Sequence, residues 1–137
     1  MALKITPADS AFSKLVRERA GWKCESCGTQ HQEGSQGLHC SHWQSRGIWQ
    51  LRHHPWNASA ACYACHMREG GNWAFRLLTD WQREHLIELS QDVALGKAAR
   101  KTKGKGEIAA HYRNELDIMR QARECGHTGR IEFEWFF

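Results

Sequence analysis

Two pairs of cysteines with the spacing Cys-x-x-Cys lie far apart in this chain. They are Cys24/Cys27 and Cys62/Cys65. Zn²⁺ binds four soft ligands tetrahedrally, and each x₂ spacing lets one turn supply two of them. A disulfide scaffold is the alternative, but residues 1–10 lack the apolar run of a secretory signal, and a reducing compartment favours metal-bound thiolates. The two pairs therefore predict a structural zinc site.

The segment between the cysteine pairs is rich in side chains that carry out acid–base and metal chemistry. It contains His39, His42 and Asn57, and His66 follows Cys65 directly. Hydrolysis of a phosphodiester requires an activated water and neutralisation of phosphate charge, which one histidine base and one divalent metal can supply. This set of residues is therefore suited to phosphodiester hydrolysis.

The order of these motifs resembles the HNH, or ββα-metal, nucleases, in which a histidine and an asparagine precede a Cys-x₂-Cys-His sequence. Over residues 12–121 the chain also resembles the phage NinG (Rap) recombination endonucleases. The shared features are Arg17-Glu18-Arg19 before the first cysteine pair, Ser41-His42-Trp43, Leu51-Arg52, Asn57 and Gly71-Asn72. Residues 1–11 and those after Gln121 lie outside the resemblance.

The resemblance implies a role for each motif residue. His42 would be the general base, Asn57 would brace the loop that holds it, and His66 would bind a catalytic Mg²⁺ or Mn²⁺. Ser41 stands where many HNH enzymes have a second metal ligand, so His39 is the expected substitute. The resemblance further implies a DNA endonuclease that acts on branched recombination intermediates, such as Holliday junctions, D-loops or forks, in a host cytoplasm.

The distribution of charge favours a polyanionic partner. The formal net charge is +4, and basic residues cluster within 14–23, 46–52 and 97–105. Such clusters are typical of nucleic-acid contacts, although each could also be a solvated surface. The predicted DNA-binding residues are Arg46, Arg52, Lys101, Lys103 and Lys105. No apolar run approaches the length of a membrane span, so a membrane partner is not expected.

Capping signals and hydrophobic periodicity predict the secondary structure. The expected elements are a helix from Thr6 to about Ala20, two short strands within Leu38–Gln50, a helical turn over Cys62–Arg68, a helix over 73–89, a helix over Glu107–Glu124 and a strand over 131–137. The fold class is therefore α+β and mostly helical.

These elements predict a single domain over residues 1–137. Its parts are an N-terminal helix (1–21), a zinc-stapled ββα-metal core (22–72), a helical extension (73–125) with a basic loop (97–106), and a C-terminal tail (126–137).

The tail leaves two alternatives open. Ile131, Phe133, Trp135 and Phe137 alternate as on one side of a strand, and such a strand could pair with a second copy in a homodimer. Alternatively, it folds back on its own domain. The function has rivals too, namely a general nicking or restriction-type HNH endonuclease and a zinc-stapled DNA-binding module without catalysis.

Overall fold

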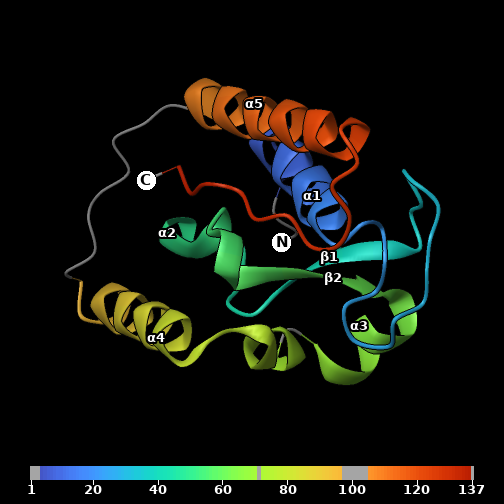
Figure 1. Ribbon diagram of the computed structural model, residues 1–137. Coiled ribbons are helices and arrows are strands. Elements are labelled where there is room, and N and C mark those ends of the chain that lie inside the picture. Colours follow the sequence, from blue (N-terminus) through green and yellow to red (C-terminus); the bar gives the residue numbers. More distant parts are fainter. Residues whose placement is uncertain (1–3, 71, 97–104, 137) are drawn as a thin grey trace.

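A computed structural model describes residues 4–70, 72–96 and 105–136 of the chain (Figure 1). The elements are α1 (Pro7–Arg19), β1 (Leu38–His42), α2 (Trp49–Arg52), η1 (Pro55–Asn57), β2 (Ala58–Cys62), α3 (Tyr63–Glu69), η2 (Asn72–Leu77), α4 (Asp80–Ala94) and α5 (Lys105–Glu124). Helices account for about half of the chain, and the sheet within the described ranges has two strands. The predicted α+β, mostly helical class is confirmed.

The first helix, α1, begins and ends where the sequence predicts. Thr6 and Asp9 form a capping box, and Pro7 occupies the first turn, where its missing N–H costs no hydrogen bond. After Ala20 the chain turns through Gly21 and Trp22, both at positive φ. The Trp22 indole donates to the Glu18 carboxylate, which holds this unusual backbone. The turn directs the chain into the first cysteine pair.

The sheet pairs β1 with β2 in antiparallel register, His39 opposite Ala61 and His42 opposite Ala58. The prediction of two strands within 38–50 is half wrong, because the second strand lies at Ala58–Cys62. The sequence of β2 is ASAAC, and alanine has a low strand propensity. Burial of four of these five residues stabilises the strand instead, which no local signal reveals.

The helical extension differs from the predicted helix over 73–89. It is divided into η2 and α4, because Thr79 caps α4 and forms a capping box with Gln82. The last helix, α5, starts two residues earlier than predicted, so Lys105 and Gly106 belong to it and not to the basic loop. The rest of that loop, with Lys101 and Lys103, lies outside the described residues, as does Gly71.

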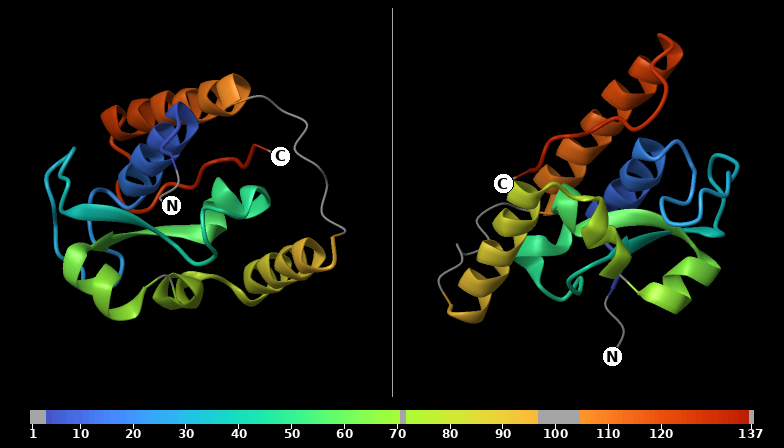
Figure 2. Two further views of the ribbon diagram at one scale, coloured as in Figure 1. Left: turned by 180° about the vertical axis from the view of Figure 1, so that it is seen from behind. Right: turned by 60° about the horizontal axis from the view of Figure 1, so that its bottom comes forward.

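The main core lies between α1 and α5, which pack against each other above the sheet (Figure 2). Phe12, Leu15 and Val16 of α1 meet Tyr112, Leu116 and Met119 of α5. A second cluster surrounds the cysteine pairs. A third joins Leu51 to Leu78 and Leu86 beneath the sheet.

The tail folds back between α5 and the sheet (Figures 1 and 2). Residues 130–136 form no strand, so that prediction is wrong for this part of the chain. Phe133 is buried in the main core, the Ile131 amide donates to the Arg19 carbonyl at 3.2 Å, and His111 Nε2 donates to the Glu134 carbonyl at 2.8 Å. Ile131, Phe133 and Trp135 thus pack within the chain, and Phe137 lies outside the described residues.

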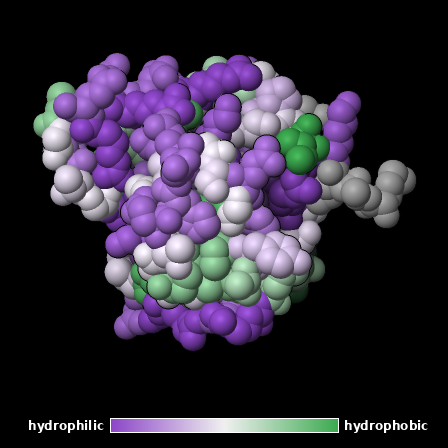
Figure 3. Space-filling model, turned by 90° about the vertical axis from the view of Figure 1, so that its right-hand side faces the viewer, coloured by the Kyte–Doolittle hydropathy of each residue, from purple (hydrophilic) through white to green (hydrophobic). Residues whose placement is uncertain are grey.

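One side of the surface is largely polar. Figure 3 shows the side that carries the 30–37 loop and α3, where hydrophilic residues dominate above a band of apolar and weakly polar ones. Among the described helices, none combines the length and the hydropathy that crossing a bilayer requires.

Candidate functional site

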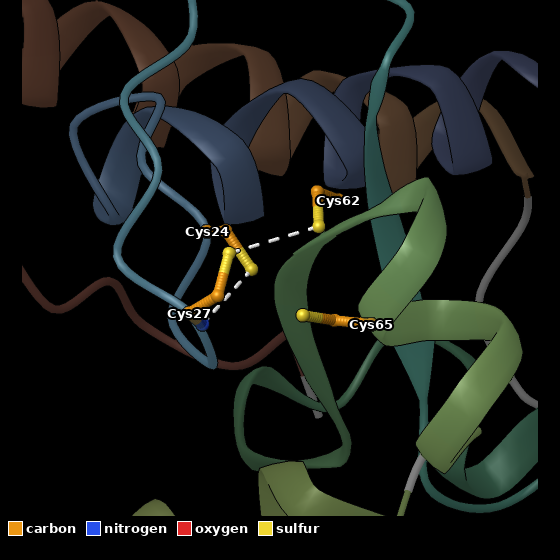
Figure 4. A group of neighbouring side chains, drawn as sticks. All are labelled: Cys24, Cys27, Cys62 and Cys65. Atoms are coloured by element: carbon orange, nitrogen blue, oxygen red, sulfur yellow. Dashed lines mark hydrogen bonds between the residues drawn. The ribbon is translucent and has the colours of Figure 1, made fainter.

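The four cysteines of the two pairs come together at one place. Cys24 and Cys27 lie in the loop after α1, Cys62 ends β2, and Cys65 lies in the first turn of α3 (Figure 4). All four sulfur atoms lie within 4.8 Å of one another. The loop is shaped by hydrogen bonds from Gly28 N to Cys24 O and from Cys24 N to Thr29 O, each 2.9 Å. The predicted ligand set is therefore assembled by the fold.

The geometry of this cluster suits zinc. Four Zn–S bonds of about 2.3 Å in a tetrahedron place neighbouring sulfurs about 3.8 Å apart. Cys27 Sγ and Cys62 Sγ are 3.8 Å apart. Hydrogen bonding with Thr29 lowers the pKa of Cys27 to about 6, which favours the thiolate that binds metal. We conclude that these cysteines form a candidate structural metal site.

The site also connects two segments that carry histidines. Cys62 and Cys65 fix the junction of β2 and α3, and β2 is paired along its length with β1. His39 of β1 and His66 of α3 therefore face each other, with their Nδ1 atoms 3.0 Å apart. Burial, aided by the neighbouring His39, lowers the pKa of His66. The lowered pKa favours the neutral, metal-binding form of the His66 imidazole.

The His39/His66 pair fits a single metal ion. Two nitrogens bound to one ion at about 2.0–2.1 Å lie about 3 Å apart when they are neighbouring ligands. Ser41, by contrast, is buried and its Oγ donates to the Gly70 carbonyl at 3.2 Å. The geometry is thus compatible with the prediction that His39, and not Ser41, supplies the second metal ligand.

His42 ends β1 and points toward α1. Its Nε2 lies 3.0 Å from the carbonyl oxygen of Arg52. A carbonyl can only accept, so Nε2 carries the proton and Nδ1 is left as the basic nitrogen. The ring packs against Phe12 at 5.9 Å, and burial lowers the pKa of His42 to about 4. His42 is therefore neutral at neutral pH.

Asn57 closes the loop between the strands. Its side chain is fully buried, accepts from Gln44 N at 2.9 Å, and donates to the carbonyls of Leu51 at 2.9 Å and Gln44 at 3.2 Å. One amide thus joins both sides of the loop whose Arg52 carbonyl orients His42. These hydrogen bonds hold the two sides of the loop together.

Two buried charged side chains support this loop, a role that the sequence did not reveal. Arg19 donates to the carbonyls of Pro55 and Ala58 at 2.7 and 2.6 Å, on either side of Asn57. Asp9 accepts from Arg52 Nε at 2.7 Å and from His53 Nε2 at 2.8 Å. Asp9 is also the N3 residue of the α1 capping box, so its place in the sequence is explained by the helix and gives no separate signal of a role at the loop.

One pocket contains all three predicted histidines. It has a volume of about 670 Å³ and lies between α1, the segment from Gln36 to His42, and α3. Its lining includes His39, His42 and His66 and the basic side chains of Lys14, Arg17 and Arg46. Asn57 is not among the lining residues and acts on the site through the loop.

The predicted DNA-binding residues have different environments. Arg46 lines the pocket. The Arg52 guanidinium is paired with Asp9 and also donates to the Lys4 carbonyl at 3.1 Å, so it already has protein partners. Lys105 is the first residue of α5.

Comparisons of the chain with protein-family models, with curated proteins and with solved structures found no match.

Proposed function

We propose that this protein is a metal-dependent endonuclease that hydrolyses phosphodiester bonds in DNA. The observation that carries the proposal is the hydrogen bond from His42 Nε2 to the Arg52 carbonyl, in a pocket that also contains His39 and His66. It presents a neutral imidazole with a free Nδ1 beside two further imidazoles whose nitrogens converge. Together with the resemblance to HNH nucleases, this arrangement supports the proposal.

In the proposed reaction, His42 Nδ1 takes a proton from a water molecule. The water attacks the phosphorus in line with the leaving 3′ oxygen, so the products carry a 5′ phosphate and a 3′ hydroxyl. Burial keeps His42 in the neutral form that accepts a proton. Asn57, Arg19 and Asp9 hold the loop that orients the His42 ring. A fixed orientation of the base lowers the activation free energy, because less entropy is lost on reaching the transition state.

His39 and His66 would hold the catalytic metal. A divalent ion there supplies charge stabilisation for the phosphate and the leaving oxygen. Mg²⁺ and Mn²⁺ are the ions proposed from the resemblance. Ni²⁺ and Co²⁺ belong in the same panel, since imidazole nitrogen binds these ions more tightly. The four-cysteine site would hold Zn²⁺ and keep β2 and α3, and hence His66, in place.

The choice of branched DNA as substrate depends on the resemblance to NinG proteins. A cleavage panel tests the function and this choice together. Full-length protein with its zinc retained is incubated with a labelled four-way junction, a fork and a plain duplex, with each metal and without.

We expect cleavage that requires the added metal and is fastest on the junction. Equal rates on all three substrates would favour a general endonuclease. Binding without cleavage under every condition would contradict the proposal and favour a DNA-binding module.

A further inference from the structure

One face of α1 forms a polar wall of the histidine pocket. Ser10, Ser13, Lys14 and Arg17 recur at the spacing of one helical face, and all four line the pocket. Arg46 lines it from the loop after β1. The wall and this loop together bring three cationic groups to the same pocket as His39, His42 and His66.

These positive charges are not compensated locally. The single acidic residue in the lining is Asp9, and its carboxylate is occupied by Arg52 and His53. Within the described part of the chain, Lys14, Arg17 and Arg46 form no ion pair, whereas Arg52, Arg76, Arg83 and Arg130 each contact a carboxylate. A pocket with three unpaired cations attracts an anion.

The Arg17 side chain is preorganised for binding such a ligand. Its Nε donates to the Ser13 carbonyl at 3.1 Å, its Nη1 to the Ser35 carbonyl at 3.4 Å, and its guanidinium lies 4.9 Å from the centre of the Trp22 ring. These contacts fix the side chain before binding and reduce the entropy lost on binding. Burial also lowers the pKa of Arg17, as expected for a cation with no anionic partner.

We propose that Lys14, Arg17 and Arg46 bind backbone phosphates of the DNA strand that enters the pocket. The guanidinium groups suit phosphate oxygens through paired N–H donors, Lys14 adds a mobile point charge, and Ser10 and Ser13 offer further donors. The strand then crosses α1 beside the histidines. The assignment rests on the proposed function, because the substrate of that reaction supplies the phosphates.

The test compares two variants of the full-length protein that each lose three positive charges. In the pocket variant, Lys14→Gln, Arg17→Gln and Arg46→Gln are combined. In the control variant, Arg76→Gln, Arg113→Gln and Arg120→Gln remove exposed charges outside the pocket and outside the basic clusters of the sequence. Binding of a fluorescent duplex is measured by anisotropy over a range of salt concentrations, without added divalent metal or chelator so that zinc is kept. Thermal unfolding verifies that both variants are folded.

Each phosphate contact contributes about 0.9 to the slope of log K against log salt. We therefore expect the slope of the pocket variant to fall by about 2.7, and that of the control variant to stay near the wild-type value. Unchanged binding by the pocket variant, equal losses in both variants, or no DNA binding by the wild-type protein would each overturn the assignment.

The two proposals fail in different ways. Loss of binding in the pocket variant, in a protein that cuts no substrate with any metal, would support the phosphate site and reject the nuclease. Wild-type cleavage together with an unchanged KM and salt slope in the pocket variant would support the nuclease and reject the phosphate site.

Discussion

At the scale of single residues, Asp9 connects the start of α1 to the loop that orients His42. Its buried carboxylate holds the Arg52 side chain, and the carbonyl of Arg52 accepts from His42. Charged hydrogen bonds of this kind contribute about 1.5–3 kcal/mol each. An Asn at this N3 position could still accept the capping-box hydrogen bond from the Thr6 amide, so a change to Asn would remove mainly the ion pair.

Asp9→Asn should lower the free energy of unfolding by about 1.5–3 kcal/mol and also lower kcat. Urea unfolding measures the first and a cleavage assay the second. Asp80→Asn is a matched control, because Asp80 also lies at a helix start but is 91% exposed. If Asp9→Asn were as neutral as the control in both assays, Asp9 would have no part in holding the loop.

Buried histidines predict how stability depends on pH. Burial lowers the pKa of His42 to about 4 and that of His54 to about 3, from 6.5. Between these values and 6.5 the unfolded chain binds more protons than the folded one. Stability should therefore fall as the pH falls from about 6.5 toward 3, by up to about 1.4 kcal/mol per pH unit for each histidine.

Urea unfolding at several pH values tests this slope. His54→Gln should reduce it, while His127→Gln should leave it unchanged because His127 is exposed. A wild-type stability that stays constant between pH 6.5 and 4 would show that these histidines titrate normally in the folded protein.

At the scale of elements, the cysteine cluster joins three pieces of the chain. It ties the loop after α1 to the end of β2 and the start of α3. Cys62→Ser should lower the zinc content and the stability together, because a missing ligand opens the tetrahedral site. Native mass spectrometry and thermal unfolding measure both.

Cys125→Ser serves as the control, since Cys125 is exposed and outside the cluster. One zinc per chain retained in Cys62→Ser, with unchanged stability, would reject the structural role of the site.

The elements that carry local signals were predicted well. A capping box marks α1, and the hydrophobic stripe marks most of α5. The strand β2 was missed because its stability comes from burial of alanines, a tertiary effect. The break before α4 was missed although Thr79 and Gln82 have capping-box spacing, because the apolar periodicity continues across it.

The same contrast applies to the site. His39, His42, His66, Asn57 and the cysteines could be named from their order along the chain. The roles of Asp9, Arg17 and Arg19 at the site could not be predicted, because their partners lie up to about forty residues away and the pairing exists only after folding.

At the scale of the whole molecule, the C-terminal tail completes the main core. Phe133 is 8% exposed and packs edge-on against Phe12 and Tyr112. Removing such a ring leaves a cavity and costs about 3–5 kcal/mol. This packing makes the tail part of its own domain.

Phe133→Ala should therefore lower the free energy of unfolding by about 3–5 kcal/mol, as measured by urea unfolding. Glu132→Ala, at an exposed neighbour in the tail, should have little effect. Light scattering on both variants addresses the alternative role of the tail. A full-length dimer that dissociates in Phe133→Ala without loss of stability would place the tail between two copies instead.

The central claim is that His42 is the base of a DNA-cutting reaction, and one comparison tests it most directly. Single-turnover cleavage is measured for the wild-type protein, for His42→Ala and for the exposed control His127→Ala, with zinc content and DNA affinity measured in parallel. The account predicts that His42→Ala alone loses about 10²–10⁴-fold or more in rate while it keeps its zinc and its affinity for DNA. Cleavage by His42→Ala at close to the wild-type rate would contradict it.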